Sequence, residues 1–302
     1  MSIAYLISAH TDAPQLKRLV DALHPDAHFF IHIDRKSDII PFTSILQREN
    51  VHFLQERVDV RWGTILEVDY QMALIKAAVD FPVTFDRIFF LSGMDYPLWS
   101  NEHITVWLEA QGDREILCGI CMDTDVINQQ QRELYQLSRP FFSCDMLGNQ
   151  GNQRLSILCR KVKKVLGVKK QLSFAVDGKQ WQLYKGSAWW CISQPLASYI
   201  HNMYRDKPEI RRYFIDSFGQ AETIIQTIAF NAPEWASKCM MCKGEYPGLA
   251  ALTPLHFIIY DPVIKVMDET DYDRLMKSGK MFARKFISGK SDQLVEKLKM
   301  RV

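Results

Sequence analysis

The sequence predicts an α/β fold in which helices flank a mainly parallel central sheet. Through the first hundred residues, short apolar runs that end in polar residues alternate with segments of helical periodicity. This alternation is typical of strands that pair in parallel through helical connections. In open sheets of this kind ligands bind beyond the carboxyl ends of the strands, so the residues after each run are the first candidates for a site.

Four apolar runs are the predicted strands, and two periodic segments between them are the predicted helices. The runs are short, rich in β-branched and aromatic residues, and bounded by polar residues, as buried strands are. The strands are expected at 3–8, 29–33, 51–54 and 87–92 and the helices at 14–23 and 68–79. The first helix has Leu16, Leu19, Val20 and Leu23 at helical spacing, which predicts one buried face.

Length and composition favour one enzyme-sized unit. The chain has 302 residues, 47% of them hydrophobic and 24% charged, which is ordinary globular usage. No linker, repeat or low-complexity segment divides it, so we expect a single domain across residues 1–302. The net charge of +2 neither demands nor excludes an anionic partner.

Cysteine usage and hydropathy favour a reduced, cytoplasmic protein. The seven Cys are an odd number without the spacing of a disulfide framework. No signal-peptide pattern is found at the start, and no stretch reaches the ~18 apolar residues that a membrane span needs. Cys239 and Cys242 have a metal-like spacing, but without a second pair they are a weak zinc signal.

The segment 154–170 is basic and amphipathic. Leu155, Leu158, Val162 and Val165 share one face of a helix. The pattern favours a surface helix whose basic face is solvated. Peripheral contact with an anionic membrane surface, or with an acidic acceptor, is the alternative.

Polar residues follow three of the predicted strands. His10 and Asp12 come after the first strand, Asp34, Arg35 and Lys36 after the second, and Asp95 after the run that ends at Ser92. Because the carboxyl ends of parallel strands meet at one edge of a sheet, these side chains are expected to lie together. Such a cluster indicates a nucleotide site, although many α/β folds share it.

Seven segments of the chain carry a resemblance to a known family. They are ISAH at 7–10, HIDRKS at 32–37, VRWG at 60–63, LSGMDYPL at 91–98, KGSAWW at 185–190, QAE at 220–222 and MFARKF at 281–286. In this order they resemble the core-2/I-branching β-1,6-N-acetylglucosaminyltransferase family, which includes the peptide O-xylosyltransferases. Any one segment is weak evidence for the family, whereas LSGMDYPL and MFARKF together are fairly specific.

The resemblance implies a fold, a reaction and partners. The fold would be of the GT-A nucleotide-sugar-binding type, with a nucleotide-binding half at 1–120 and an acceptor-binding and catalytic half at 121–302. The reaction would be metal-independent, inverting transfer of GlcNAc from a UDP-sugar to a saccharide or lipid-linked saccharide, giving a β-linkage. Neither a cofactor nor nucleic acid is implied. The absence of an anchor pattern resembles a bacterial member at the inner face of the membrane.

Other readings stay open beside this one. The donor could instead be UDP-xylose or UDP-glucuronate, because the motifs define the nucleotide end better than the sugar end. The chain could also be a catalytically inactive carbohydrate-binding protein. A metal-dependent transferase is a further reading, since Asp123 and Asp125 match a metal-binding Asp-x-Asp string; they lie in a polar segment and not directly after a strand, so we expect no metal site.

The resemblance also assigns the reacting end of the site. Glu222 matches the catalytic base, although Gln220 and Ala221 replace the family's usual Pro-Asp. A base is needed to deprotonate the acceptor hydroxyl. Lys285, with Arg284 beside it, matches the diphosphate-binding position, where cations must supply the charge if no metal does. The family's second phosphate-binding Arg is missing from 256–265, where Lys265 and His256 are candidate substitutes.

The remaining site residues are assigned by the same resemblance. His10, Asp34 and Arg35 would form the nucleoside end, and Arg61, Trp62 and Gly63 would line the cleft. Asp95 is included, with organisation of its loop as its expected role. The acceptor site would consist of Lys185, Ser187, Trp189 and Trp190. Because adjacent residues on a strand point to opposite faces, at most one of the two Trp rings can stack on a sugar.

Overall fold

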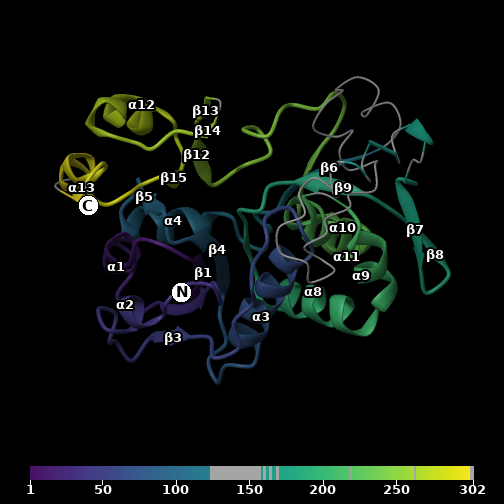
Figure 1. The fold of residues 1–302 in the computed structure, drawn as a ribbon, viewed down its shortest axis with the longest axis horizontal. Helices are drawn as coiled ribbons and strands as arrows, with labels where there is room; N and C mark the ends of the chain where they lie inside the picture. The colour runs from purple at the N-terminus through teal and green to yellow at the C-terminus, as the bar shows by residue number, and fades with distance from the viewer. Residues whose placement is uncertain are drawn as a thin grey trace.

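A five-stranded sheet in the order β10-β4-β1-β2-β3 lies at the centre of the N-terminal part of the protein (Figure 1). The structure is a computed structural model, and it describes residues 1–122, 170–217, 219–261 and 263–299 with a few positions between 158 and 167. All strand pairs of this sheet are parallel except β10 with β4. The α/β class with a mainly parallel central sheet is therefore confirmed.

The four predicted strands and two predicted helices begin and end close to the expected positions, whereas β10, α2 and α4 were not predicted. The runs form strands because β-branched and aromatic residues fit a pleated surface that is covered on both faces. The strands are β1 (Ile3–Ala9), β2 (His28–Ile33), β3 (Val51–Phe53), β4 (Arg87–Ser92) and β10 (Cys191–Ile192), and the helices are α1 (Ala13–Ala22), α2 (Ile40–Thr43), α3 (Leu66–Val79) and α4 (Asn101–Ala110).

Helices cover both faces of the sheet, because successive strand residues point to opposite sides. Tyr5 and Ile7 of β1 belong to one core cluster, which also holds the apolar faces of α1 and α4. Ala4 and Leu6 belong to another, with α3, α8 (Gln194–Asp206) and α10 (Ile224–Phe230). The layers on the two faces fix the strand ends in place.

The second part of the chain adds a smaller sheet beside α10. Its order is β11-β6-β9, and a separate hairpin of β7 and β8 follows the gap in the described residues. The backbone of β6 approaches Gly186 in β9 so closely that only glycine fits. A Cβ at this position would lie 2.0 Å from the Cys118 carbonyl oxygen. The elements are β6 (Cys118–Cys121), β7 (Ser173–Val176), β8 (Lys179–Gln182), β9 (Tyr184–Gly186), α9 (Pro208–Phe214), a 3-10 turn at Gln220–Glu222, α11 (Pro233–Ala236) and β11 (Met240–Cys242).

The C-terminal segment returns to the N-terminal sheet. β15 pairs in parallel with β12 and antiparallel with β5, which directly follows β4. Tyr96, Phe286 and Leu294 belong to a third core cluster that buries this segment. The elements are β5 (Asp95–Pro97), β12 (His256–Ile258), β13 (Tyr260–Asp261), β14 (Val263–Ile264), a 3-10 turn at Glu269–Asp271, α12 (Tyr272–Lys277), β15 (Phe282–Arg284) and α13 (Asp292–Lys299).

Two sequence expectations fall wholly or largely outside the described residues. Asp123 and Asp125 lie outside them, as does most of the basic segment 154–170. In the part of the chain that is described, no helix is long and apolar enough to cross a bilayer. The peripheral membrane contact stays a prediction.

Candidate active site at the carboxyl ends of the strands

The polar residues that follow β1, β2 and β4 meet at one edge of the sheet. Their position is set by hydrogen bonds across the strand ends: Asp34 N–H donates to the Ala9 carbonyl at 2.9 Å and Gly93 N–H to the Ser8 carbonyl at 2.8 Å. β15 reaches the same edge through its pairing with β5 (Figure 1), where Arg284 lies opposite Asp95. Residues nearly two hundred positions apart are thus neighbours.

Asp95 is the buried anchor of this edge. Its carboxylate accepts from Ser92 N–H at 2.7 Å and pairs with His256 Nε2 and Arg284 Nη1, both at 3.1 Å. Burial by itself would raise the pKa of Asp95, but these three partners outweigh it and lower the pKa. Because the side chain is fully buried, it cannot contact a ligand here. Asp95 pairs with Arg284 in this conformation, and its predicted contact with a nucleotide is untested.

Arg284 is sandwiched between Asp95 and an indole ring. Its guanidinium carbon lies 5.1 Å from the ring centroid of Trp189, in a cation–π arrangement. Trp189 in turn packs against His256, with ring centroids 4.9 Å apart, and against Phe90 at 5.8 Å. The Trp189 ring is partly exposed, so the prediction that it contacts the acceptor stays open.

Positive charge gathers around Lys285 and His10. Partial burial lowers the pKa of Lys285, and the charges of Arg284 and Lys290 lower it further. Burial also lowers the pKa of His10; Asp34 opposes this, whereas Arg284, Lys285 and Lys36 act in the same direction. The predicted nucleoside and diphosphate residues therefore lie within electrostatic reach of one another. Such a cluster suits an anionic ligand.

Asp34 organises the loop after β2. Its carboxylate accepts from the backbone N–H of Lys36 at 3.0 Å and of Val60 at 3.4 Å, and pairs with Lys36 Nζ at 3.2 Å. Arg35 is exposed, with its backbone N–H bonded to the Val58 carbonyl. Direct contact of Asp34 or Arg35 with a nucleoside is untested.

The loop 60–63 leads into α3 and is held by that helix. Gly63 has φ +74°, which favours glycine, and its N–H donates to the Glu67 carboxylate at 2.8 Å. Arg61 pairs with Asp59 at 3.1 Å. Trp62 is 78% exposed, so its ring can be reached by a ligand.

Glu222 and Lys185 form an ion pair at the start of α10. The ammonium nitrogen lies 2.5 Å from the Glu222 carboxylate. The Lys185 side chain is 6% exposed and that of Glu222 is 31% exposed, so the carboxylate is the more accessible partner. Lys185 therefore serves the carboxylate, and its predicted contact with an acceptor is untested.

A second carboxylate, Glu67, lies close to Glu222. Burial, together with the charge of Glu222, raises the pKa of Glu67 to about 7 against the hydrogen bond from Gly63. Tyr70 lies one helical turn after Glu67. Burial and the charge of Glu67 raise the pKa of Tyr70 to about 12, against the charge of Arg284.

Two predicted acceptor residues belong to the core. Trp190 is fully buried and stacks with Phe90 at a centroid distance of 5.5 Å. Ser187 is 3% exposed, and its hydroxyl accepts from Trp189 N–H at 3.2 Å while its carbonyl accepts from Gln226. Both side chains are buried in this conformation, and their predicted contact with an acceptor is untested. Of the Trp pair, Trp189 alone is placed to do so.

The two proposed substitutes for the missing phosphate-binding Arg are both paired with acids. His256 is fully buried against Asp95. Lys265 Nζ lies 2.6 and 2.7 Å from the two carboxylate oxygens of Asp271. Because His256 is buried and Lys265 is paired with Asp271, neither is a ready partner for a diphosphate.

Sequence reasoning did not find Glu67 or Lys290, and it named Asp12 only as a polar residue after the first strand. Glu67 reads as an ordinary first-turn acid of a helix, which favourably faces the helix dipole. Its four-residue spacing from Gly63 is the one signal that could have linked it to the loop. Asp12 reads as a helix cap and does cap α1, accepting from Gln15 N–H at 3.0 Å.

A metal site is not found within the part of the chain that the structure describes, where no group of three or more His, Cys, Asp or Glu is placed to hold an ion. Cys242 lies 3.4 Å from Cys118, sulfur to sulfur. Because Asp123 and Asp125 lie outside the described residues, metal independence stays a prediction.

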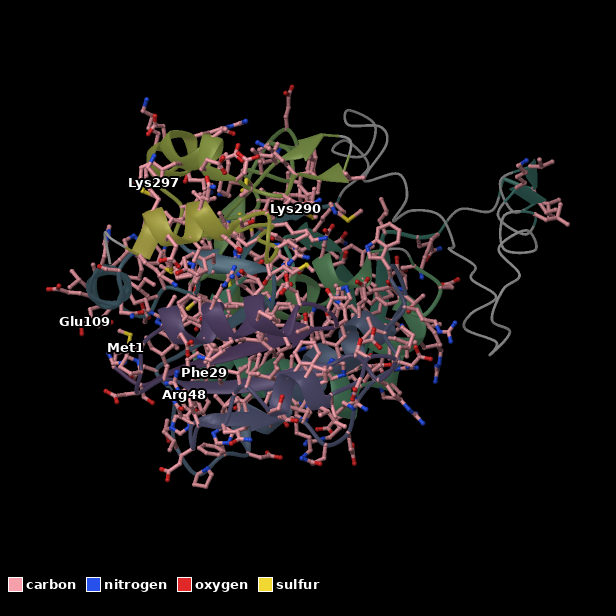
Figure 2. All side chains as sticks on the ribbon, turned by 60° about the vertical axis from the view of Figure 1, so that its left-hand side comes forward. Met1, Phe29, Arg48, Glu109, Lys290 and Lys297 are labelled. Carbon is pink, nitrogen blue, oxygen red and sulfur yellow. The ribbon has the colours of Figure 1, made fainter. Side chains whose placement is uncertain are left out.

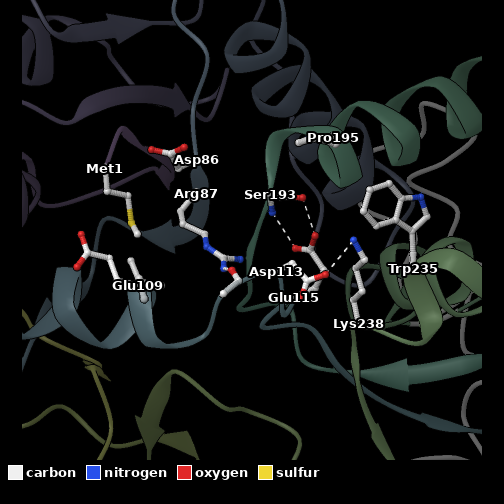
Figure 3. A pocket seen from close by; sticks show the side chains of 12 residues that line it. Met1, Asp86, Arg87, Glu109, Asp113, Glu115, Ser193, Pro195, Trp235 and Lys238 are labelled. Carbon is white, nitrogen blue, oxygen red and sulfur yellow. Dashed lines mark hydrogen bonds and ion pairs between the residues drawn. The ribbon is translucent and has the colours of Figure 1, made fainter.

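A cavity of about 650 Å³ opens at the other edge of the sheet, near the start of β4 (Figure 3). Polar side chains that line it make hydrogen bonds within the protein. Glu115 accepts from the backbone N–H and hydroxyl of Ser193, and Arg87 donates to the Gly112 and Arg114 carbonyls. The hydrogen bonds from Ser193 to Glu115 hold the start of α8 in place. The cavity lies away from the charged cluster.

Comparison with known proteins gives the family. The family model described as "Branch: Core-2/I-Branching enzyme" matches residues 3–246. Xylosyltransferase 2 of Mus musculus is 26% identical over 245 residues, which cover 78% of this chain and 25% of that protein. The protein of the same name from Rattus norvegicus is 24% identical over 97% of this chain and 33% of its own length. The chain thus spans a quarter to a third of these relatives.

Solved structures match less closely. A 4-diphosphocytidyl-2C-methyl-D-erythritolsynthase from Anaerococcus prevotii is 14% identical and aligns over 91% of this chain and 95% of its own, with a TM-score of 0.39.

Proposed function

Because this chain belongs to the Core-2/I-Branching enzyme family, a family of glycosyltransferases, we propose that it transfers a sugar from a UDP-sugar to a saccharide acceptor. The transfer is inverting and needs no metal. The observations that support it best are the partly exposed Glu222 carboxylate, ion-paired with a buried Lys, and the Lys285 ammonium group, which has no acidic partner among the described residues. A base and a diphosphate site are the two parts that this reaction requires.

Glu222 is the general base of the proposed reaction. It takes the proton of the acceptor hydroxyl as that oxygen attacks the anomeric carbon, and the bond from this carbon to the UDP oxygen breaks on the opposite face. One displacement inverts the configuration without a covalent sugar–enzyme intermediate. Lys185 holds the carboxylate in place from its buried side.

Lys285 stabilises the departing diphosphate. Its ammonium group has no acidic partner among the described residues, whereas Arg284 beside it is committed to Asp95. Lys285→Ala should therefore weaken UDP much more than uridine, since a charge-assisted contact to phosphate contributes about 1.5–3 kcal/mol. Isothermal titration of both ligands checks this. Equal losses for UDP and uridine would remove Lys285 from the diphosphate site.

The donor sugar is GlcNAc in the first proposal and xylose in the second. GlcNAc follows from the resemblance to the β-1,6-N-acetylglucosaminyltransferases, and xylose follows from the relatives called Xylosyltransferase 2. UDP-glucuronate is a third donor of the same kind. The acceptor is a saccharide, free or lipid-linked, and we place the reaction in the cytoplasm at the inner face of the membrane.

A thermal-shift panel of UDP-GlcNAc, UDP-xylose and UDP-glucuronate, each with and without EDTA, tests the function. A ligand that binds only the folded protein raises the melting temperature. We expect a shift that EDTA leaves unchanged, with the true donor giving the largest one. A shift lost with EDTA would favour metal dependence through Asp123 and Asp125. No shift with any nucleotide would favour a carbohydrate-binding protein.

A further inference from the structure

Two cysteines from distant parts of the chain meet in the smaller sheet. Sulfur atoms are scattered among the side chains of the described residues (Figure 2, yellow), and the Sγ atoms of Cys118 and Cys242 lie 3.4 Å apart. Cys118 begins β6 and Cys242 ends β11, 124 positions later. The proposed reaction does not use this contact.

Strand pairing brings the two sulfurs to one face of the sheet. β11 pairs in parallel with β6, and Cys242 lies opposite Ile120, two residues after Cys118. Because alternate side chains of a strand share a face, Cys118 and Cys242 point to the same side. The other side lies against α10, since a Cβ on Gly119 would meet the Phe230 ring at 2.5 Å. The register of the two strands therefore sets the contact between the thiols.

The same two strands argue against a four-cysteine metal site. Sequence reasoning missed that Cys118 and Cys121 repeat the spacing of Cys239 and Cys242, and two such pairs are a zinc signal. Cys121 lies three residues after Cys118, so it points to the opposite face of β6. Among the described residues no group of three or more His, Cys, Asp or Glu is placed to hold an ion. The chemistry that Cys118 and Cys242 share is that of a dithiol.

The two thiols differ in their access to solvent. Cys118 is 4% exposed, whereas Cys242 is partly exposed and lies between the exposed Met241 and Lys243. Burial, together with the neighbouring Cys242 sulfur, raises the pKa of Cys118 to about 12, so this thiol stays protonated at neutral pH. The thiolate is the form that attacks a disulfide. Cys242 is therefore the sulfur that an oxidant in solution meets first.

We propose that Cys118 and Cys242 are a redox-modification site, at which a small disulfide such as oxidised glutathione converts the two thiols to a reversible intramolecular disulfide. The sulfurs have to approach from 3.4 Å to about 2.05 Å. In a reducing compartment such disulfides are usually transient and redox-sensing. β6 also pairs with β9, which carries Lys185, so the new bond fixes the strand beside the one that supports Glu222. The inference goes beyond the proposed function and does not rest on it.

The exchange proceeds in two steps. The Cys242 thiolate attacks one sulfur of the glutathione disulfide, forms a mixed disulfide and releases a glutathione thiolate, which takes up the proton that Cys242 lost. The Cys118 sulfur then attacks Cys242 Sγ, the mixed disulfide breaks, and the second glutathione leaves with the proton of Cys118. Two protein thiols are thus oxidised by two electrons, and one glutathione disulfide is reduced to two glutathione molecules.

Non-reducing peptide mapping tests the inference. The reduced full chain is incubated in glutathione buffers of increasing oxidised content, quenched with acid, alkylated and digested. We expect two peptides joined through Cys118 and Cys242, which dithiothreitol separates again. The oxidised protein should melt about 5–10 °C above the reduced protein, because the bond closes a loop that spans 124 positions.

Two variants assign the effect. Cys242→Ser should abolish both the joined peptides and the rise in melting temperature, whereas Cys121→Ser, on the opposite face of β6, should keep both. Should Cys242→Ser fail to fold, the peptide map of the unaltered protein still decides the matter.

Three outcomes would overturn the inference. They are two free thiols after incubation with excess oxidised glutathione, glutathione that stays bound to Cys242 without the intramolecular bond, and crosslinks that join other cysteines, among them Cys144 and Cys159 outside the described residues. Titration of UDP tests the proposed function separately, and a failure there would leave the disulfide unaffected.

Discussion

The ammonium nitrogen of Lys185 lies 2.5 Å from a carboxylate oxygen of Glu222, and the two residues differ in exposure. The lysine is buried in β9, while the carboxylate stays open to an incoming group. A buried cation that supports an accessible carboxylate fits a general base better than it fits a structural ion pair, in which both partners would be similarly buried or similarly exposed. Three predictions concern this carboxylate and its neighbours, and one concerns the buried anchor of the nucleotide side.

Glu222→Gln should lower kcat by about 100- to 10,000-fold while leaving UDP affinity nearly unchanged, because the amide cannot accept the proton. UDP release in the presence of acceptor and titration of UDP measure the two quantities. Glu234→Gln, on exposed α11, is the control and should keep full activity. Retained transfer with weakened UDP binding would show that Glu222 belongs to the nucleotide site.

Lys185 and Glu222 should show a measurable coupling free energy. Removing one partner leaves the other without its counter-charge, whereas removing both avoids that cost. The double variant Lys185→Met with Glu222→Gln should therefore be more stable than the sum of the single variants predicts. We expect a coupling of about 1 kcal/mol, because solvent screens the partly exposed carboxylate. Urea unfolding of all four proteins measures it, and strict additivity would contradict the ion pair.

Glu67 should make the free energy of unfolding fall as pH rises from about 4.5 to about 7. Its pKa is raised from 4.5 to about 7 in the folded state. Between these values the folded protein binds more protons than the unfolded chain, so stability decreases with pH. The upper bound is about 3 kcal/mol for such a shift.

Urea unfolding across this pH range, with Glu67→Gln as the test variant, checks the Glu67 prediction. The amide mimics the protonated acid, so Glu67→Gln should flatten the pH dependence in this window. Glu102→Gln, an exposed first-turn acid of α4, should leave it unchanged. An identical slope in Glu67→Gln and the unaltered protein would assign the effect to other groups.

Asp95→Asn should destabilise the protein by about 3–5 kcal/mol, the cost of breaking a buried charge pair. The substitution leaves Arg284 without its anion and disrupts the bond to His256. Because the pKa of Asp95 is lowered in the folded state, its contribution is present above the unfolded pKa and is lost as pH falls through the folded one. Chemical denaturation at neutral pH measures the loss, and Asp113→Asn, whose side chain is 82% exposed, should be near neutral. A loss below 1 kcal/mol would mean that Asp95 is not the anchor.

Four strands and two helices of the first hundred residues could be predicted from the sequence, because their signals are local, whereas the short α2 and β5 were missed. Apolar runs at 3–8 and 87–92 become β1 and β4, and helical periodicity at 68–79 becomes most of α3. The edge where the site forms was also predictable, since parallel strands bring their carboxyl ends together. The family resemblance added the residues of the second half, which periodicity alone does not place.

Only the tertiary structure decided which of these residues can act. Asp95 meets His256 across 161 positions and Arg284 across 189, and no local pattern records such contacts. Burial separated Trp189 from its neighbour Trp190, and it placed Glu67 beside Glu222. The sequence by itself determined the class of fold and the kinds of chemistry present, because propensity and periodicity act over a few residues. Which charges are compensated, buried or free to meet a ligand depends on packing between distant segments, and that is settled only when the chain has folded.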